Sequence, residues 1–396
     1  MSKPEAESWH LVTGEYPPLR GGVGDFSATV AHLLASDGGQ VFVWTPNSTG
    51  KSDPGEPASP DGDGSGIRTR RADFDRAGLI RLGTQLDALA GPKRILIQYV
   101  PNAFGFRGMN LPFCDWVRRR QTAGDDVRVV FHEPFFYFGF TKPHRNVLAM
   151  VQRLMAWTLM RGARIVYLST PTWERYLRPY SKPGNPRFVW LPLPATLPVV
   201  SDPAEVANRR LRRIEGVAAG ILLGHFGTYG SDIAIPLETL IPRLLDARPA
   251  AHFLLLGRRS DLFCKEMRER VPRHAARLHA TGDLSPEEAS LDLQTCDVLL
   301  QPYPDGVTAR RTSLINLLAH GSAVVTTEGL LTEHFWKESK ACLLRDPRDE
   351  TGLIDAVVEA ASSQTSIKLW GGRAKAFHDK TFHPNRLRQS LALEAR

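Results

Sequence analysis

The chain has 396 residues, of which 42% are hydrophobic and 23% charged, a composition typical of a soluble globular protein with two domains. Its formal net charge of +8 suits an anionic ligand or an anionic membrane surface and does not require nucleic acid as a partner. Four widely spaced cysteines argue against a zinc site or a disulfide framework and favour a cytoplasmic protein with reduced thiols. No apolar run is long enough for a transmembrane helix, so we expect any membrane contact to be peripheral.

The N-terminal half alternates short apolar runs with helical patterns. A glycine-rich loop at 21–24 precedes a helix that has Phe26, Val30, Leu33 and Leu34 on one face. Residues 47–66 are rich in Pro, Gly, Ser and Asp and are predicted to be a surface loop. The predicted strands are 9–13, 41–44, 95–100, 127–131, 165–168 and 188–191. Strands that alternate with helices predict a parallel sheet covered on both faces.

A proline-rich stretch between Pro192 and Pro203, followed by the basic run 209–213, interrupts this pattern. We therefore predict an N-terminal domain at 1–196, a linker at 197–214 and a C-terminal domain at 215–380. The segment 381–396 is a candidate helix that packs back on the N-terminal domain. The second domain repeats the alternation, with predicted strands at 221–227, 253–256, 277–280, 297–300 and 323–327. The fold class predicted is thus α/β, with two doubly wound domains that face a central cleft.

Two adjacent arginines, Arg310 and Arg311, stand between the strand 297–300 and an amphipathic helix. The first N–H groups of a helix are unpaired and its dipole is positive there, so anions are favoured. Guanidinium groups add forked donors that suit phosphate oxygens. The sequence therefore predicts a diphosphate site that needs no metal. The alternative is a solvated basic helix start, although cations at this position oppose the helix dipole.

Several segments together resemble the family 4 glycosyltransferases of the GT-B fold, and they follow one another in that family's order. They are the loop 21–24 with its helix and the strand 41–45, the run 281–288, the strand that ends at Gln301, and the helix and strand at 312–327. The resemblance implies a retaining, metal-independent hexosyltransferase of the cytoplasm, with peripheral contact to the inner membrane face left open. No cofactor is implied. A nucleotide-sugar is the donor, and a glycan, glycolipid or small molecule is the acceptor.

The same resemblance assigns roles to individual residues. Gly282, Asp283 and Leu284 would border the base, and Asn316 stands where the family has a glutamate that holds the ribose. Backbone N–H groups of the loop 305–308 would line the sugar and phosphates. The donor set is Gly22, Gly24, Gly227, Thr228, Gly282, Asp283, Leu284, Gly306, Val307, Thr308 and Asn316. The catalytic candidates are Arg310, Arg311, His132 and Asp305, and the acceptor candidates are Glu133 and Asp25.

The chain departs from the family pattern in two ways. It lacks the Arg and Lys that follow Phe226 and Gly227 in the family, and its paired glutamates are absent from their usual register. We hypothesise that Arg310 and Arg311 replace the missing cations. The alternatives are a degenerate nucleotide-sugar-binding or assembly protein, or another GT-B enzyme such as a nucleotide-sugar epimerase. A run at 50–52 resembles the end of a phosphate-binding loop, but Thr45 stands where the first glycine is needed and 53–55 cannot start a helix. An acidic pair at 61–63 lacks the apolar strand that leads into a metal-binding pair, so no metal site is predicted.

Overall fold

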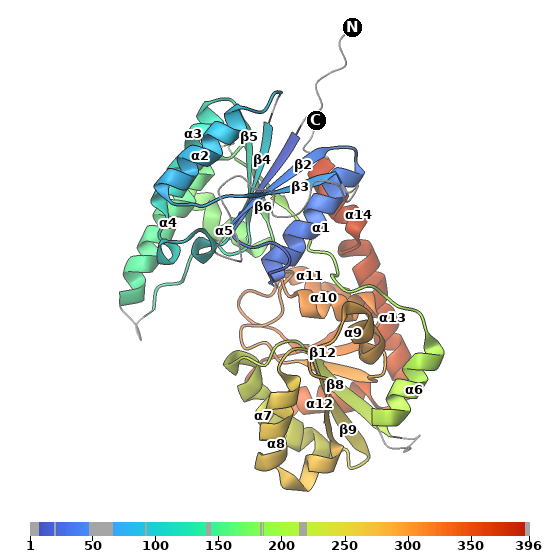
Figure 1. The fold of residues 1–396 in the computed structure, drawn as a ribbon. Coiled ribbons are helices and arrows are strands. Elements are labelled where there is room, and N and C mark those ends of the chain that lie inside the picture. Colours follow the sequence, from blue (N-terminus) through green and yellow to red (C-terminus); the bar gives the residue numbers. More distant parts are fainter. Residues whose placement is uncertain are drawn as a thin grey trace. The chain divides into compact units, whose positions relative to one another are not determined.

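The computed structural model describes residues 8–19, 21–46, 66–91, 93–139, 144–182, 184, 186–213 and 220–392. The chain forms two compact units (Figure 1): unit 1 comprises residues 1–191 and 388–396, and unit 2 comprises residues 192–387. The predicted surface loop, apart from Gly66, lies outside the described residues, as do the two motifs rejected within it.

Unit 1 is built on a seven-stranded sheet in the order β3-β2-β1-β4-β5-β6-β7, in which all neighbours are parallel. Its strands are β1 (Ser8–Thr13), β2 (Gln40–Thr45), β3 (Ile67–Arg71), β4 (Lys93–Tyr99), β5 (Asp126–Phe131), β6 (Ile165–Leu168) and β7 (Arg187–Trp190). The sequence analysis missed β3. This strand is only partly buried and carries three arginines, a composition typical of a sheet edge and not of a core strand.

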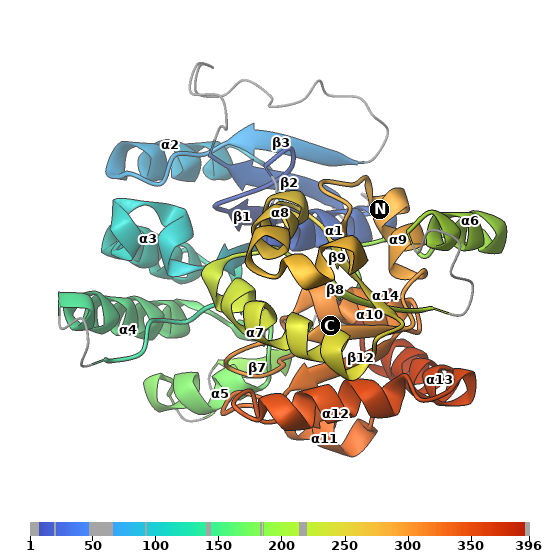
Figure 2. The ribbon, with the colours of Figure 1, turned by 90° about the horizontal axis from the view of Figure 1, so that it is seen from below.

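Helices cover both faces of this sheet, and α2 to α5 form one layer (Figure 2). The helices of unit 1 are α1 (Gly22–Ser36), α2 (Arg76–Asp87), α3 (Leu111–Thr122), α4 (His144–Gly162) and α5 (Thr172–Leu177), with 3-10 turns η1 (Pro101–Phe104), η2 (Phe106–Gly108) and η3 (Arg178–Tyr180). Helix α1 buries Phe26, Val30 and Leu34, which confirms the face predicted from their spacing.

Unit 2 contains a six-stranded parallel sheet in the order β10-β9-β8-β11-β12-β13. Its strands are β8 (Ile221–Phe226), β9 (Ala251–Leu256), β10 (Leu278–Ala280), β11 (Val298–Gln301), β12 (Ala323–Thr327) and β13 (Leu343–Arg345). Its helices are α6 (Pro203–Arg213), α7 (Ser231–Ala247), α8 (Ser260–Arg270), α9 (Pro286–Leu293), α10 (Thr312–Ala319), α11 (His334–Ser339), α12 (Glu350–Ala360) and α13 (Gln364–Thr381), with the 3-10 turn η4 (Pro272–Arg277). Apolar side chains of α7, α8 and α12 pack on the sheet and form the main core.

The segment predicted as a linker, 197–214, contains helix α6, and its basic run is not the solvated face that such runs usually form. Arg209 and Arg213 both reach the buried carboxylate of Asp292, at 3.3 and 3.5 Å. Arg210 pairs with Asp297 at 2.7 Å. These contacts attach α6 to unit 2, because partly buried arginines are stabilised by specific acceptors.

The last helix, α14 (Pro384–Ala392), begins in unit 2 and ends in unit 1. Arg388, which belongs to unit 1, donates to Ser36 Oγ at 2.9 Å and lies 3.4 Å from the carboxylate of Asp37. The C-terminal segment thus contacts the end of α1, in the N-terminal half of the chain.

Candidate active site

The loops that follow the strands of unit 2 meet at the carboxyl edge of its sheet, where parallel α/β sheets bind ligands. Gly227 and Thr228 follow β8, the stretch 282–284 follows β10, and the stretch 305–308 follows β11. The structure therefore brings the predicted donor residues of the C-terminal half, apart from Asn316 in α10, to this one edge. The same edge includes two loops that the sequence analysis did not single out, 257–259 after β9 and 328–333 after β12.

The loop after β11 is held tightly against the loop after β12. Gly306 has a φ of +84°, and a side chain there would place its Cβ 2.1 Å from the backbone nitrogen of Gly329. The N–H of Gly306 donates to the Tyr303 carbonyl at 3.1 Å, and that of Val307 donates to the Thr327 carbonyl at 2.8 Å. These two N–H groups are therefore engaged within unit 2, so the prediction that they line the phosphates does not fit this conformation.

A buried carboxylate that the sequence analysis missed, Glu333, fixes the start of α10. Glu333 is 6% exposed and accepts hydrogen bonds from the Ala309 N–H at 3.0 Å and the Trp336 indole at 3.0 Å. Trp336 is itself fully buried. Because Glu333 is far from Ala309 in the sequence and follows a loop, no local pattern distinguishes it from a surface acid.

The two predicted arginines share one carboxylate, that of Asp305. Arg311 is hydrogen-bonded to Asp305, and its guanidinium lies 4.5 Å from the centre of the Tyr303 ring. Arg310 lies 3.9 Å from the same carboxylate. The three residues thus carry a net charge of +1, so a phosphate would meet a partly neutralised pair.

Three buried polar atoms of uncharged side chains near the carboxyl edge have no hydrogen-bond partner within the described part of the chain. They are His225 Nδ1 on β8, Gln301 Oε1 on β11 and Thr308 Oγ1 in the following loop. Strands β8 and β11 are neighbours, and the Gln301 amide nitrogen donates to the Phe226 carbonyl at 2.9 Å. An unpaired buried polar atom costs about 1–3 kcal/mol. Such a group indicates that a polar ligand or water completes the site.

Burial lowers the pKa of His225 to about 3, so its imidazole is neutral at physiological pH. A neutral imidazole has one nitrogen that donates and one that accepts. His225 therefore offers hydrogen bonding and no charge to this edge, and the positive charge must come from arginines.

Two further arginines, Arg258 and Arg259, are exposed directly after β9 and were missed by the sequence analysis. Within the residues that the structure describes, neither side chain forms a hydrogen bond or ion pair, and the Arg259 carbonyl accepts from the Phe263 N–H at 3.1 Å. Arg259 has a φ of +67° at the start of α8, an uncommon backbone conformation for a residue other than glycine. The preceding Gly257 is required, because a Cβ there would lie 2.5 Å from the Gly227 carbonyl oxygen. The signal in the sequence was the run Gly-Arg-Arg-Ser after an apolar strand.

The loops after β9 and β10 are connected by short polar contacts. The Gly282 N–H donates to Ser260 Oγ at 2.9 Å, and the Gly257 N–H donates to Thr281 Oγ1 at 3.1 Å. Gly282 has a φ of +68°, which favours glycine at this position. The predicted base-binding stretch 282–284 is thus held next to the arginine-bearing loop, with Asp283 exposed.

The structure gives Asn316 a different role from the ribose contact that was predicted. Its amide oxygen accepts from the N–H groups of Thr196, at 2.8 Å, and Leu197, at 3.0 Å. Its amide nitrogen donates to Thr196 Oγ1 at 3.1 Å, and the residue is 3% exposed. Both lone pairs of the oxygen are used, so none remains for a ribose hydroxyl. Asn316 instead holds the segment at 196–197 on α10.

In unit 1, His132 lies at the carboxyl end of β5, as predicted. Its Nε2 lies 2.8 Å from Gln98 Oε1 on the neighbouring strand β4, and because an amide oxygen only accepts, Nε2 carries the hydrogen. Phe26 packs its ring edge against the imidazole at 5.2 Å between centroids. These contacts fix the ring orientation. The adjacent Glu133 is exposed.

The glycine-rich loop of unit 1 already binds a carboxylate. Glu15 Oε1 accepts from the N–H groups of Val23 and Gly24, both at 3.0 Å, at the start of α1. Gly22 and Asp25 are exposed beside it. A helix N-terminus attracts anions, and here the protein supplies one. The predicted contact of Gly24 with a diphosphate is therefore blocked in this conformation.

Among the described helices, none is long and apolar enough to cross a membrane. Across the described residues, no three His, Cys, Asp or Glu side chains gather closely enough to hold a metal ion. The four cysteines are free thiols, as predicted.

No protein-family model matches the chain, and no curated protein matches it in sequence. Solved structures do match. Sucrose-phosphate synthase from Thermosynechococcus elongatus superposes with a TM-score of 0.73 at 15% identity, covering 99% of this chain and 98% of that chain. HepE from Anabaena, in complex with UDP and glucose, has a TM-score of 0.67 at 13% identity, covering 99% of each chain. WaaG, a glycosyltransferase involved in lipopolysaccharide biosynthesis, has a TM-score of 0.65 at 14% identity, covering 96% and 98%.

These similarities extend over nearly the whole chain, at identities that carry information on fold alone. The two parallel sheets with flanking helices agree with them, so the fold class implied by the sequence resemblance is confirmed. The chain has the GT-B fold of these glycosyltransferases.

Proposed function

We propose that the protein is a glycosyltransferase that transfers a sugar from a uridine-diphosphate sugar to a hydroxyl acceptor, with retention and without a metal. The observation that carries this proposal is the carboxyl edge of unit 2, where unpaired buried polar atoms lie among loops that bear four arginines. Similar structures support the choice of nucleotide: HepE has been solved in complex with UDP-glucose, and a trehalose-phosphate synthase from Burkholderia vietnamiensis is UDP-forming.

The donor site that we propose revises the predicted one. Arg258 and Arg259 provide two unpaired positive charges, and Arg310 and Arg311 provide a net charge of +1 together with Asp305. Thr308, Gln301 and His225 provide uncharged hydrogen-bonding atoms. Asn316 is left out, because its amide is engaged by the backbone at 196–197.

The chemistry required of this site is stabilisation of charge. As the bond between sugar and phosphate breaks, the leaving diphosphate gains negative charge, and fixed donors directed at it lower the barrier. Arginine is suited to this because its planar fork binds two phosphate oxygens at once. The departing phosphate can accept the proton of the acceptor hydroxyl, so the reaction needs no protein nucleophile. We propose His132, Glu133 and Asp25 as contacts to the sugar and the acceptor.

A second candidate is a nucleotide-sugar-binding protein without turnover. It is supported by the carboxylate of Glu15 at the start of α1 and by the engaged amide of Asn316, two positions where the family resemblance implied ligand contacts. The two candidates differ in a single observable, release of nucleotide from its sugar conjugate.

The test is a thermal-shift screen of UDP, GDP, ADP, dTDP and their sugar conjugates, with and without EDTA. A ligand at about 100 times its dissociation constant stabilises a protein by about 2.7 kcal/mol. We expect UDP or its conjugates to raise the melting temperature irrespective of EDTA. The shift should fall in Arg258→Ala and Arg310→Ala and persist in Arg270→Ala, a matched exposed arginine at the other end of α8.

The screen is followed by a measurement of UDP release from the conjugate that binds. A shift with release supports the transferase, and a shift without release or transfer to any acceptor supports the binding protein. Absence of a shift with every nucleotide would contradict both.

A further inference from the structure

Two neighbouring loops of unit 1 expose aromatic side chains at the carboxyl edge of its sheet. The loop after β4 exposes Phe106, and the loop after β5 exposes Tyr137 and Phe138, with exposed fractions of 53%, 49% and 55%. Strands β4 and β5 are paired, so the two loops leave the sheet side by side. We call these three residues the aromatic rim. Several exposed rings on adjacent loops, unlike a single one, indicate a binding surface.

The backbone that carries Phe106 is strained. All four residues from Gly105 to Gly108 have a positive φ, and the two that are not glycine, Phe106 and Arg107, have values of +51° and +53°. This conformation is an outlier for a bulky side chain. Such strain persists only where surrounding contacts impose it, and strained segments cluster at ligand sites. The fold therefore enforces the exposed position of Phe106.

Two consecutive residues of α4 hold these loops in place. Gln152, which is fully buried, donates to the Gly108 carbonyl at 3.4 Å and accepts from the Phe136 N–H at 2.8 Å. Arg153 donates to the Phe136 carbonyl at 2.8 Å, and its guanidinium lies 4.0 Å from the centre of the Phe138 ring. Because the guanidinium covers one face of a ring that is still largely exposed, the other face is open to solvent. The rim is thus ordered before any ligand binds, which lowers the entropic cost of binding.

Aromatic contacts connect the rim with His132. The ring of Tyr137 meets that of Tyr176 on α5 edge to face, with 5.7 Å between centroids. Tyr176 meets Trp173 in the same way at 6.0 Å, and the Trp173 indole donates to the His132 carbonyl at 3.1 Å. Glu133, the next residue, is exposed at the same edge. The rim is therefore linked to the two residues that we propose as contacts to the sugar and the acceptor.

We propose that the aromatic rim stacks a pyranose ring, which makes the acceptor a saccharide. The C–H groups on one face of a pyranose form an apolar surface that packs on an aromatic ring, while its hydroxyls remain at the periphery. The exposed carboxylate of Glu133 accepts from hydroxyls, and the exposed guanidinium of Arg107 donates to them. A purely apolar acceptor would draw these charged groups out of water with no hydrogen bonds in exchange. The word acceptor rests on the proposed transferase function, whereas stacking of a saccharide on the rim does not.

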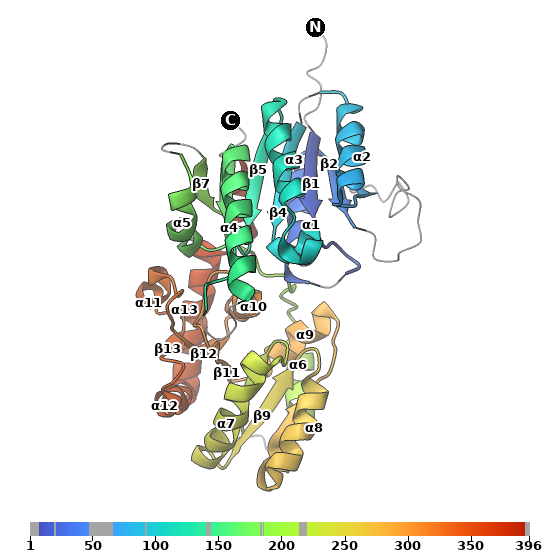
Figure 3. The same ribbon diagram turned by 90° about the vertical axis from the view of Figure 1, so that its left-hand side faces the viewer.

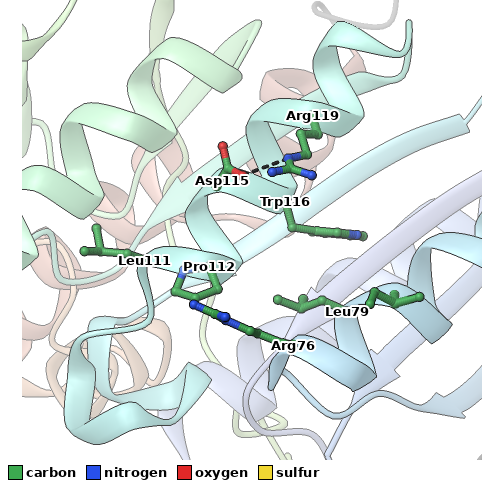
Figure 4. A pocket seen from close by; sticks show the side chains of 8 residues that line it. Arg76, Leu79, Leu111, Pro112, Asp115, Trp116 and Arg119 are labelled. Carbon is green, nitrogen blue, oxygen red and sulfur yellow. Dashed lines mark hydrogen bonds and ion pairs between the residues drawn. The ribbon is translucent and has the colours of Figure 1, made fainter.

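Another hollow of unit 1 with an aromatic wall lacks this combination of groups. A groove of about 530 Å³ between α2 and α3 is bordered by the indole of Trp116 (Figure 4). Its carboxylate, that of Asp115, is already paired with Arg118 at 2.9 Å and with Arg119 at 2.8 Å. The groove also lies between two helices and not at the ends of strands. The aromatic rim is therefore the surface of the two that suits a saccharide.

Helix α4 also supplies a matched control for the rim. It runs antiparallel to the strands, so it begins at the carboxyl edge of the sheet and ends at the opposite edge (Figure 3). Trp157, in its last two turns, resembles Phe138: it is 39% exposed, and the Arg161 guanidinium lies 4.2 Å from its ring centre. Trp157→Ala therefore removes an exposed ring covered by an arginine, but away from the rim.

The test is saturation-transfer NMR of the full-length protein, with and without UDP, against the methyl pyranosides of glucose, galactose and mannose. We expect at least one of them to receive saturation, mainly on the C–H protons of one ring face. Tyr137→Ala and Phe138→Ala should each weaken its binding about tenfold, through loss of a stacked ring. Phe138→Tyr keeps the ring and should retain the affinity. Trp157→Ala should bind like the parent protein.

Unchanged melting temperatures and nucleotide shifts would show that the rim variants are folded and that unit 2 is intact. The proposal is overturned if no pyranoside binds the parent protein, or if both alanine variants bind it as well as the parent does. It is also overturned if the protein dimerises in solution and Phe138→Ala abolishes dimerisation, because the rim is then an interface between copies.

The same experiment separates this inference from the proposed function. A nucleotide shift without binding of a pyranoside contradicts the saccharide site at the rim and leaves the donor site standing. Binding of a pyranoside that depends on Tyr137 and Phe138, without a shift by any nucleotide, supports the rim as a saccharide site and contradicts the transferase function.

Discussion

Both units are built on a parallel sheet, but they differ in whether the positions that favour anions are already occupied by a group of the protein. In unit 1 the N-terminus of α1 is occupied by the carboxylate of Glu15. In unit 2 the carboxyl edge has unpaired polar atoms at His225, Gln301 and Thr308, and unpaired cations in the loop after β9. The difference teaches that a glycine-rich helix start does not by itself indicate a ligand site. A site is indicated where donors and charges remain unsatisfied after folding.

The comparison is tested most strongly by removing the arginines that precede α10. We expect Arg310→Ala and Arg311→Ala each to lower the transfer rate by about 10²–10³, because each removes a donor to the leaving diphosphate. Initial rates of nucleotide release measure the effect, with Arg270→Ala as the control. Wild-type rates in both variants would mean that the diphosphate does not bind at this edge.

Loss of the Glu333 carboxylate should destabilise unit 2. Glu333→Ala leaves the buried Ala309 N–H and Trp336 indole without their acceptor, at a cost of about 3 kcal/mol. The free energy of unfolding in urea measures this. Glu338→Ala in helix α11, which directly follows Glu333, should change stability little, because the Glu338 side chain is 66% exposed. Equal effects of the two substitutions would contradict the anchoring role of Glu333.

The exposed arginines after β9 should affect binding more than folding. We expect Arg258→Ala and Arg259→Ala each to weaken UDP affinity about tenfold, the loss of roughly one charge-assisted hydrogen bond. Calorimetric titration with UDP measures the affinity, and the melting temperature without ligand should not fall. If affinity is retained, these arginines are solvated surface cations.

Removal of the Glu15 carboxylate should affect folding more than nucleotide binding. Glu15→Ala leaves the N–H groups of Val23 and Gly24 without their acceptor, and we expect a loss of about 1 kcal/mol of unfolding free energy. UDP affinity should stay the same, because the nucleotide site proposed is in unit 2. A large change in UDP affinity in Glu15→Ala would mean that the start of α1 takes part in donor binding.

Acid should destabilise unit 2 more than unit 1. Burial lowers the pKa of His225 to about 3 and of His279 to about 4 in unit 2, and of His10 to about 4 in unit 1. Below the ordinary pKa of 6.5, these histidines are protonated in the unfolded chain but stay neutral in the folded protein. The free energy of unfolding is therefore highest above pH 6.5 and falls as the pH drops toward 4.

Urea unfolding between pH 7 and 4 measures this effect. His225→Gln should reduce the slope of the unfolding free energy against pH. Hydrogen exchange of each unit separates their responses. A slope that is unchanged in His225→Gln would contradict a neutral, buried His225.

Much of the architecture followed from the sequence, because the periodicities of strands and helices are local. Alternation of apolar runs with helical patterns predicted two parallel sheets, and Phe26, Val30 and Leu34 were predicted correctly to face the core. The position of His132 after β5, and of the loop 305–308 after β11, followed from where each strand ends. Strand β3 was not predicted, because three of its residues are arginines and it lies at the edge of the sheet.

What the sequence determined by itself was therefore most of the strands and helices in their order along the chain, and the free cysteines. Only the tertiary structure decided which polar groups satisfy one another. Asp305 pairs with Arg311, Asn316 accepts hydrogen bonds from the backbone at 196–197, and arginines of α6 form ion pairs with Asp292. A hydrogen bond depends on two partners that are often distant in sequence, so the pattern around either residue does not reveal it. The charges left without a partner, on which the proposed donor site depends, can be identified only once those pairs are known.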